Sequence, residues 1–330
     1  MKDKIIKEEL DLIQMSGVET KEIDWLWYPY IPYGKVTVVQ GDPGEGKTTF
    51  VLSLLALLTN GEPLPEEEQG DEAVNVIYQT AEDGLGDTIK PRLERAGADL
   101  DRVFVINETN EILSMTDERI EQAIEKTNAK VVVLDPIQAY LGAGVDMHRA
   151  NEIRPIFSKL SNLAQETGCA IILIGHLNKS GGSKSAYRGI GSIDIGAAVR
   201  SVLVIGRDKE EKTLRIVAHS KSNLSPEGQS IAFELNPETG FHWRGYCETT
   251  VDDLLSGKGS TVNKTTQAEN LLKEILAETD LSFEEVKKYA DEIGVSHRTL
   301  MTAKKNIGVD STKKGGKWYW SFQECKSVSS

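Results

Sequence analysis

The first residues whose types and spacing predict chemistry form a glycine-rich turn, Gly41-Asp42-Pro43-Gly44-Glu45-Gly46-Lys47-Thr48. An apolar run, Val36–Gln40, precedes this turn and a helical pattern follows it. Glycines let backbone N–H groups converge on phosphate oxygens, and a helix N-terminus adds the positive end of its dipole. Lys47 is expected to reach the β- and γ-phosphates, and the Thr48 hydroxyl to bind Mg²⁺. The predicted nucleotide-binding residues are Gly41, Asp42, Pro43, Gly44, Glu45, Gly46, Lys47, Thr48 and the adjoining Thr49.

A magnesium nucleotide needs a second acidic element beside the phosphate loop. The apolar run Val131–Leu134 ends in Asp135, the pattern of a strand-end carboxylate that orders Mg²⁺ through water. Such an Asp is common at strand ends, so the assignment depends on the phosphate loop. Thr48 and Asp135 are the predicted metal-site residues.

Hydrolysis also needs a group that activates or orients the attacking water. Glu82 follows the apolar run 74–80 and ends the sequence Tyr78-Gln79-Thr80-Ala81-Glu82, and Asp83 is the rival carboxylate. Both could equally be solvated loop acids. The sequence pattern alone leaves the choice open.

The elements that must position these residues alternate between strands and helices. Short apolar runs that predict strands buried on both faces lie at 36–40, 73–80, 103–107, 131–135, 170–176, 202–206 and 214–219. Helical patterns lie between them at 47–58, 116–127 and 150–167, and an edge hairpin is predicted from 231–235 and 241–243. This alternation predicts an α/β fold whose mainly parallel twisted sheet is flanked by helices.

Four segments in this order resemble the RecA/DnaB superfamily of ring-forming ATPases, particularly plasmid RepA-type replicative helicases and related phage and mobile-element ATPases. They are the phosphate loop, Thr80-Ala81-Glu82, Asp135 and Ile174–Lys179; the sequence Tyr187–Asp194 resembles the motif after the family's DNA-facing loop. The similarity covers roughly residues 20–245. It implies a RecA-like domain that binds ATP and Mg²⁺ and assembles as a homo-oligomer, with a hexameric ring as the expected form.

The resemblance also implies roles for particular residues. Glu82 matches the strand-end Glu that positions water, and Asp135 matches Walker B. Pro136 stands where AAA+ proteins carry a catalytic Glu, which favours Glu82 as the base. His176 takes the position of a γ-phosphate sensor, with a satisfied structural histidine as the alternative.

Ring ATPases complete the site with a cation from the next subunit. The segment 219–228 is similar to the family's finger motif, in which a Lys is followed two positions on by Arg; here Lys221 is followed by Asn223. Arg200 is similar to the RepA-type arginine finger and is the first choice, with Lys221 second. A surface ion pair is the alternative for Arg200.

Two polar or Gly-rich segments, 136–151 and 178–188, are expected at the carboxyl ends of strands, where α/β sheets bind ligands. The second contains Lys179, Lys184 and Arg188, the predicted DNA-binding residues. In the family such loops line the ring's channel and follow single-stranded DNA. Contacts of this kind with phosphates ignore base sequence.

The C-terminal part predicts a separate small domain. We assign 1–250 to the ATPase domain, 251–267 to a polar linker and 268–325 to a winged helix-turn-helix of three helices and a β-ribbon. From His297 onward there are seven Lys or Arg against two Asp or Glu. This basic part could meet DNA phosphates through Arg298, Lys304, Lys305, Lys313, Lys314 and Lys317, or bind a protein partner. Trp318 and Trp320 are expected to fill the small core.

Composition limits the remaining possibilities. The 330 residues are 39% hydrophobic and 27% charged, with a net charge of -13, so a wholly basic nucleic-acid binder is excluded. Cys169, Cys247 and Cys325 form no metal or disulfide pattern, and no apolar run is long enough to span a bilayer. We expect a cytoplasmic protein without a membrane partner.

Three functions remain open at this point. The first is an ATP-dependent replicative DNA helicase of a mobile element, acting on single-stranded DNA with a replication initiator or primase as a possible partner. The second is a RecA/RadA-like recombination or repair ATPase without unwinding, and the third is an ATP-switched DNA-binding regulator.

Overall fold

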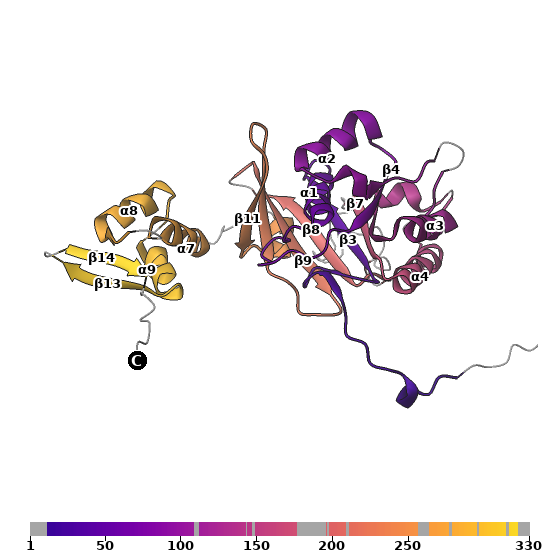
Figure 1. Cartoon of the computed structure of the whole chain (residues 1–330), viewed down its shortest axis with the longest axis horizontal. Coiled ribbons are helices and arrows are strands. Elements are labelled where there is room, and N and C mark those ends of the chain that lie inside the picture. Colours follow the sequence, from indigo (N-terminus) through magenta and orange to yellow (C-terminus); the bar gives the residue numbers. More distant parts are fainter. Residues whose placement is uncertain are drawn as a thin grey trace, which may run out of the picture.

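A nine-stranded sheet of order β11-β10-β9-β8-β3-β7-β6-β4-β5 forms the centre of the computed structural model (Figure 1). The structure describes residues 12–108, 112–142, 144–146, 149–176, 196, 198–208, 211–256, 264–276, 279–295, 297–314 and 317–322. The strands of the sheet are β3 (Val36–Gly41), β4 (Asn75–Thr80), β5 (Val103–Phe104), β6 (Ala129–Asp135), β7 (Ala170–His176), β8 (Ser201–Arg207), β9 (Leu214–Ser222), β10 (Ser230–Asn236) and β11 (Gly240–Cys247).

The strands from β8 to β5 are parallel, whereas β9, β10 and β11 extend the sheet by antiparallel pairing. Helices separate most of the parallel strands along the chain, because parallel neighbours can be joined only by crossovers. The prediction of a mainly parallel, helix-flanked α/β sheet is confirmed. The predicted edge hairpin is also present, as β10 and β11.

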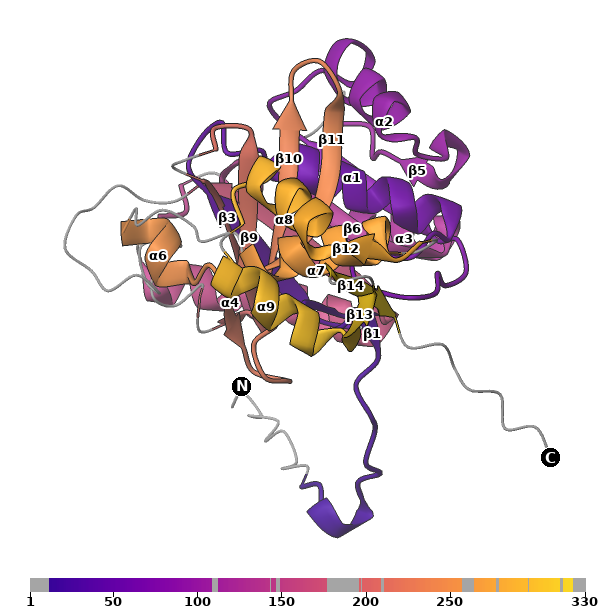
Figure 2. The same ribbon diagram turned by 90° about the vertical axis from the view of Figure 1, so that its left-hand side faces the viewer.

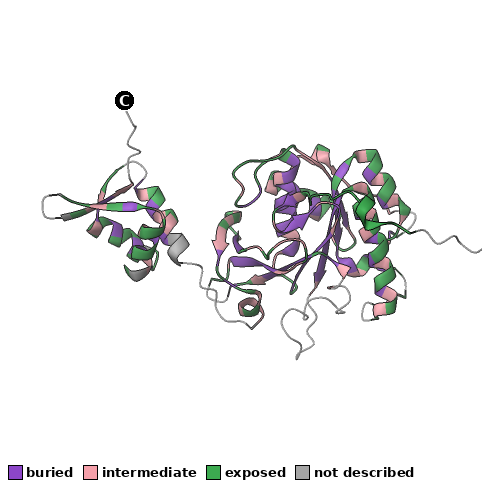
Figure 3. Ribbon diagram, turned by 90° about the horizontal axis from the view of Figure 1, so that it is seen from below, coloured by how far each residue is buried: buried purple, intermediate pink, exposed green. Residues whose placement is uncertain are grey.

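Helices cover both faces of the sheet. They are α1 (Lys47–Asn60), α2 (Lys90–Ala96), α3 (Glu118–Thr127) and α4 (Ala150–Thr167). Side chains of α1 and α2 belong to one apolar cluster with the sheet, and those of α3 and α4 belong to a second. The strands are buried, and the outer sides of the helices are exposed (Figure 3). The sheet therefore has a separate core on each face.

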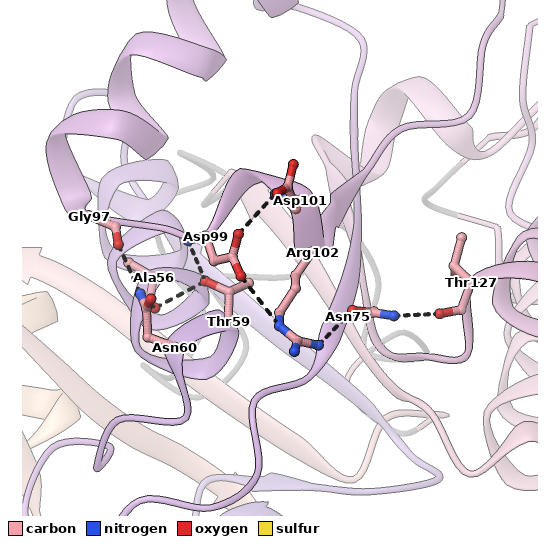
Figure 4. A network of polar contacts seen from close by, with 9 residues as sticks. All are labelled: Ala56, Thr59, Asn60, Asn75, Gly97, Asp99, Asp101, Arg102 and Thr127. Carbon is pink, nitrogen blue, oxygen red and sulfur yellow. Dashed lines mark hydrogen bonds and ion pairs between the residues drawn. The ribbon is translucent and has the colours of Figure 1, made fainter.

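Helix α1 carries the phosphate loop at its first turn and is fixed at its other end by a polar network (Figure 4). Asn60 donates to the carbonyl of Gly97 at 2.8 Å, and the Thr59 hydroxyl accepts from the Asp99 N–H at 3.1 Å. Arg102 pairs with Asp99 and donates to Asn75 on β4 at 3.2 Å. These bonds fix the C-terminal end of α1 to α2 and β4. Helix α1 is therefore held in place, and with it the phosphate loop at its other end.

Several short elements were not predicted. They are η1 (Met15–Gly17), β1 (Trp25–Trp27), β2 (Ile31–Pro32), the π-helical turn η2 (Leu85–Ile89), η3 (Leu100–Arg102) and η4 (Ile137–Tyr140). The hairpin of β1 and β2 packs Trp27 and Ile31 into the core that contains α1. Residues 12–24 lead away from the sheet in both views (Figures 1 and 2).

Both ends of the predicted linker, 251–267, are helical. Helix α6 (Val251–Ser256) packs against β8 and β9, and Leu254 lies so close to Gly206 that a Cβ there would be 2.9 Å from its Cδ2. The segment 251–256 contains the apolar residues Val251, Leu254 and Leu255 beside two aspartates, and six residues are too few to show a helical period. Helix α7 (Lys264–Ile275) then begins four residues earlier than expected.

The C-terminal module contains the three helices and β-ribbon that the sequence predicts. After α7 come β12 (Leu281–Ser282), α8 (Phe283–Glu292), α9 (His297–Asn306), β13 (Val309–Lys314) and β14 (Lys317–Phe322). Ser282 and Glu285 form a capping box at the start of α8. Ser296, just before α9, and the side chain of Arg298 lie outside the described residues. The division into two domains and the winged-helix assignment remain predictions.

The two tryptophans of the module differ. Trp320 is buried against Phe283, as expected, but Trp318 is 53% exposed, so its predicted core position is wrong. Residues two apart on a strand share one face, so Trp318 lies on the face of Trp320 but beyond the edge of the small core. Lys313 lies over the Trp318 ring at 6.0 Å. In the described part of the chain, no helix is both long and apolar enough to cross a membrane.

Candidate nucleotide site

The phosphate loop joins the end of β3 to the first turn of α1. Gly44 and Gly46 have φ angles of 80° and 90°, which other residues rarely adopt. A Cβ at Gly46 would also lie 2.6 Å from Cδ1 of Leu235 on β10. Glycine at 46 is therefore favoured by its backbone angle, and the Leu235 side chain would have to move if a larger residue stood there.

Lys47 lies inside the turn that its own loop makes. Its Nζ donates to the carbonyls of Gly41 at 2.9 Å and Asp42 at 3.0 Å, and the residue is 6% exposed. Burial lowers the pKa of Lys47, while Asp135 and other nearby carboxylates oppose that shift. Among the described residues no carboxylate forms an ion pair with Nζ. A buried cation held only by neutral groups is suited to an anionic ligand.

Asp135 ends β6 and receives two hydrogen bonds on the same oxygen. Thr48 Oγ1 donates to its Oδ2 at 2.8 Å and Tyr78 OH donates to it at 2.7 Å. Burial raises the pKa of the Asp135 carboxyl, and the two hydrogen bonds act in the opposite direction. Burial also raises the pKa of Tyr78, with the charge of Asp135 adding to the effect.

Tyr78 was missed from the sequence. Its side chain reaches Asp135 because β4 pairs with β6, and strand order is not visible in the sequence. The predicted pair of Thr48 and Asp135 does meet in the structure.

Glu82 and Asp83 follow β4 and lie beside Asp135. Thr80 is aligned with Asp135 across β4 and β6, and the Ala81 N–H donates to the Asp135 carbonyl at 3.1 Å. Asp83 forms an ion pair with Arg92 of α2 at 2.9 Å. Glu82 is exposed and has no ion pair or hydrogen bond with any described residue. Of the two rival carboxylates, Glu82 is therefore available for a ligand, whereas Asp83 is already paired with Arg92.

His176 ends β7, in register with Gly41 of the neighbouring strand β3. Its Nδ1 lies 3.2 Å from Lys47 Nζ. Because an ammonium can only donate, Nδ1 is the acceptor and a neutral ring carries its proton on Nε2. The predicted sensor and the phosphate-loop lysine are thus in direct contact.

Arg200 and Lys221 lie at the other end of the sheet. Ser201 is aligned with Thr37 at the start of β3, so these cations are separated from the loop by roughly 17 Å of strand. Lys221 donates to the carbonyls of Gly196 and Val199, the latter at 2.9 Å, and burial lowers its pKa. The Arg200 side chain is exposed and makes no ion pair with the described residues. Neither cation can reach its own chain's phosphate loop.

Three predicted DNA-binding residues, Lys179, Lys184 and Arg188, lie outside the described residues. The same is true of most of the segments that carried the resemblance after His176, namely 177–179 and 187–194.

The residues of the site fit a magnesium nucleotide. Asp135 is a buried carboxylate whose oxygen is shared by Thr48 and Tyr78, and Lys47 is a buried cation without a carboxylate partner among the described residues. The described residues contain no cluster of three or more His, Cys, Asp or Glu that could hold a metal by themselves. Mg²⁺ usually binds through one or two carboxylates, water and phosphates, and Asp135 and Thr48 could supply the protein oxygens.

A phosphate loop after the central strand, with a carboxylate at the end of a nearby strand, defines the class of P-loop nucleotide-binding proteins. Residues 7–182 match the sequence profile of a family described as AAA domain, and the chain belongs to that family. The match confirms the P-loop ATPase class that the motifs predicted.

The chain is 28% identical over 261 residues to the DNA repair protein RadA of Halalkalibacterium halodurans, covering 78% of this chain and 52% of RadA. It thus spans about half the length of that relative. Among solved structures it is similar to that of a DnaB-like replicative helicase (TM-score 0.49, 15% identity, 64% of this chain and 57% of that one). A KaiC-like protein of Pyrococcus horikoshii OT3 is similar at a TM-score of 0.46 and 20% identity, over 64% of this chain and 90% of that one.

Proposed function

We propose that this chain hydrolyses ATP with Mg²⁺ and uses the energy to move along single-stranded DNA, as a ring-forming replicative helicase of the RepA-like type. One observation carries the proposal. Glu82 follows β4 and Asp135 ends β6, and Ala81 is hydrogen-bonded to Asp135. The two acids thus come from adjacent strands beside the phosphate loop, the arrangement expected of the RecA/DnaB superfamily.

In this proposal the N–H groups of residues 41–49 and the Lys47 ammonium bind the phosphates of ATP. Thr48 and Asp135 would hold Mg²⁺, which would neutralise charge on phosphate oxygens. Glu82 accepts a proton from the attacking water, a role supported by its exposure and by the engagement of Asp83 with Arg92. His176 contacts Lys47 and so could respond to the γ-phosphate.

The ring part of the proposal rests on the cations at the far end of the sheet. Arg200 is exposed and cannot reach its own phosphate loop, so it could act only on a nucleotide held by another molecule. Lys221 is second choice because two carbonyls already hold its ammonium. Residues 12–24 support self-association, since Leu12, Ile13 and Met15 are each more than 75% exposed.

The DNA part rests on composition. Lys179, Lys184 and Arg188 follow the strand that ends at His176, so a basic segment is joined directly to the nucleotide site. A replication initiator or primase is the proposed partner of the whole assembly. Cys169 and Cys247 are buried free thiols, which agrees with a proposed cytoplasmic location.

A second candidate is a repair or recombination ATPase. The similarity to RadA, which is named a DNA repair protein, favours it. Such a protein would hydrolyse ATP on DNA without displacing a strand.

The test is ATP turnover with and without single-stranded DNA, followed by strand displacement on forked DNA. Stimulated turnover with displacement is the expected result. Stimulated turnover without displacement would favour the repair ATPase, and turnover that ignores DNA would contradict both.

A further inference from the structure

Two arginines face each other beside the phosphate loop, on the side of the antiparallel strands. Arg207 is the last residue of β8, Arg215 is the second residue of β9, and the two are directly opposite in the strand register. Like charges at opposite positions destabilise a strand pair unless an anion compensates them. The compensating anion comes from the phosphate loop.

That anion is Glu45. Its Oε2 lies 3.6 Å from Nε of Arg207 and 3.6 Å from Nε of Arg215. Both distances exceed normal hydrogen-bond length, and Oε2 is buried without a hydrogen-bond partner among the described residues, as is Arg215 Nε. One carboxylate is therefore shared by two guanidinium groups, and the trio keeps one positive charge in excess.

The two arginines are held very differently. The Arg215 side chain is 7% exposed, and its Nη1 donates to the carbonyls of Lys212 at 2.7 Å and Leu214 at 3.1 Å. The Arg207 side chain is 44% exposed, and its Nη2 reaches the Gly44 carbonyl only at 3.4 Å. Arg215 is fixed, whereas Arg207 can exchange its partner at little cost.

We propose that Arg207 binds the phosphates of the nucleotide held by its own chain, and that Glu45 competes for Arg207 until the nucleotide arrives. Gly44, which Arg207 contacts, belongs to the phosphate loop, so phosphates bound there lie within reach of the same guanidinium. Guanidinium groups form strong paired hydrogen bonds with phosphate. Arg215 is a positioning residue that keeps Glu45 in place. This inference rests on the proposed nucleotide site, but not on the ring or on DNA.

The test is a double-mutant cycle on the dissociation constants of Mg·ATP and Mg·ADP, measured by calorimetry on the full chain. Arg207→Ala should weaken ATP binding about tenfold, and Glu45→Gln should tighten it several-fold, because a competitor is removed. In the Arg207→Ala background, Glu45→Gln should change binding by less than about twofold. The control is Glu234→Gln, in an ion pair with Arg244 on β10 and β11 that does not contact the loop.

Each other outcome overturns the proposal. If Glu45→Gln tightens binding equally in both backgrounds, Glu45 acts by simple repulsion of phosphate and not through Arg207. If Glu45→Gln weakens ATP binding as Arg207→Ala does, the ion pairs of Glu45 with the two arginines only stabilise the conformation of the phosphate loop. Melting temperatures check that each variant folds, and Arg207→Gln replaces Arg207→Ala where that variant is unstable. Failure of the unaltered chain to bind ATP would instead contradict the proposed function.

Discussion

The two ends of β3 carry two kinds of site. At its carboxyl end, one chain brings together Lys47, Thr48, Asp135 and His176, which are linked in pairs by hydrogen bonds or direct contacts. At its amino end lie Arg200 and Lys221, cations that touch no described part of the phosphate loop. The first site is assembled by folding alone. The second gains a role in catalysis only if a second molecule supplies the nucleotide.

The largest effect is expected at the nucleotide site, at the carboxyl end of β3. Lys47→Ala removes the buried ammonium, so ATP binding and turnover should fall by about a hundredfold or more. Lys90→Ala is the matched control, because Lys90 is an exposed lysine in a surface pair with Glu94. Turnover retained by Lys47→Ala would contradict the nucleotide-site assignment.

The next largest effect is expected at the amino end of β3, where Arg200 and Lys221 lie. Arg200→Ala should reduce turnover by about a hundredfold while leaving ATP binding intact, because its ligand is on another subunit. Mixing it with Lys47→Ala protein should restore part of the activity, since each variant supplies what the other lacks. Lys221→Ala should have the smaller effect. Mixtures that show no recovery in any proportion would count against a finger acting between subunits.

A buried histidine, His219, lies near the amino end of β3, and its burial predicts that the stability of the fold depends on pH. His219 Nδ1 accepts from the Gly228 N–H at 2.9 Å, so Nε2 carries the proton and donates to Ser201 Oγ at 3.0 Å. Burial lowers the pKa of His219 from 6.5 to about 4. Above about pH 6.5 His219 is neutral in both the folded and the unfolded chain, and the free energy of unfolding is at its full value. As the pH falls toward 4, only the unfolded chain takes up a proton on this ring, so the free energy of unfolding falls by on the order of 3 kcal/mol.

Urea unfolding near pH 7.5 and pH 5 measures this loss. His219→Gln can keep both hydrogen bonds without titrating, so its stability should change less between the two pH values. His242→Gln, at an exposed position of β11, should behave like the unaltered chain. An unchanged pH dependence in His219→Gln would show that other groups cause it.

The smallest effect is expected from Tyr78, which supports Asp135 in the nucleotide site. Tyr78→Phe removes one of the two hydrogen bonds to Asp135 and should cost about 1–2 kcal/mol of folding free energy. Thr48 still holds the carboxylate, so ATP binding should weaken only slightly, with a higher Mg²⁺ requirement. Thermal unfolding and a Mg²⁺ titration measure the two effects. A loss as large as that of Lys47→Ala would mean that Tyr78 has a direct role in catalysis.

Local patterns made one part of this structure predictable. The phosphate loop is a contiguous turn between a strand and a helix, and Asp135 ends an apolar run, so both could be found in the sequence. The bounds of α4 were predicted to the residue. Contacts that depend on strand order could not be found: Tyr78 meets Asp135, and Glu45 meets Arg215, only because particular strands are neighbours.

Exposure was also hard to predict where the core is small. Trp318 and Trp320 share one face of β14, and only the extent of the module decides which of them is covered. Helix α2, between Lys90 and the left-handed Gly97, was overlooked because it has only seven residues and one buried side chain, Leu93.

The most direct test of the account is ATP hydrolysis by Glu82→Gln, measured beside Asp83→Asn. Glu82 is exposed next to Asp135, whereas Asp83 is paired with Arg92. Glu82→Gln should bind ATP normally but hydrolyse it about a hundredfold or more slowly, while Asp83→Asn should stay within about tenfold of the unaltered chain. Normal turnover by Glu82→Gln, or a greater loss in Asp83→Asn, would contradict it.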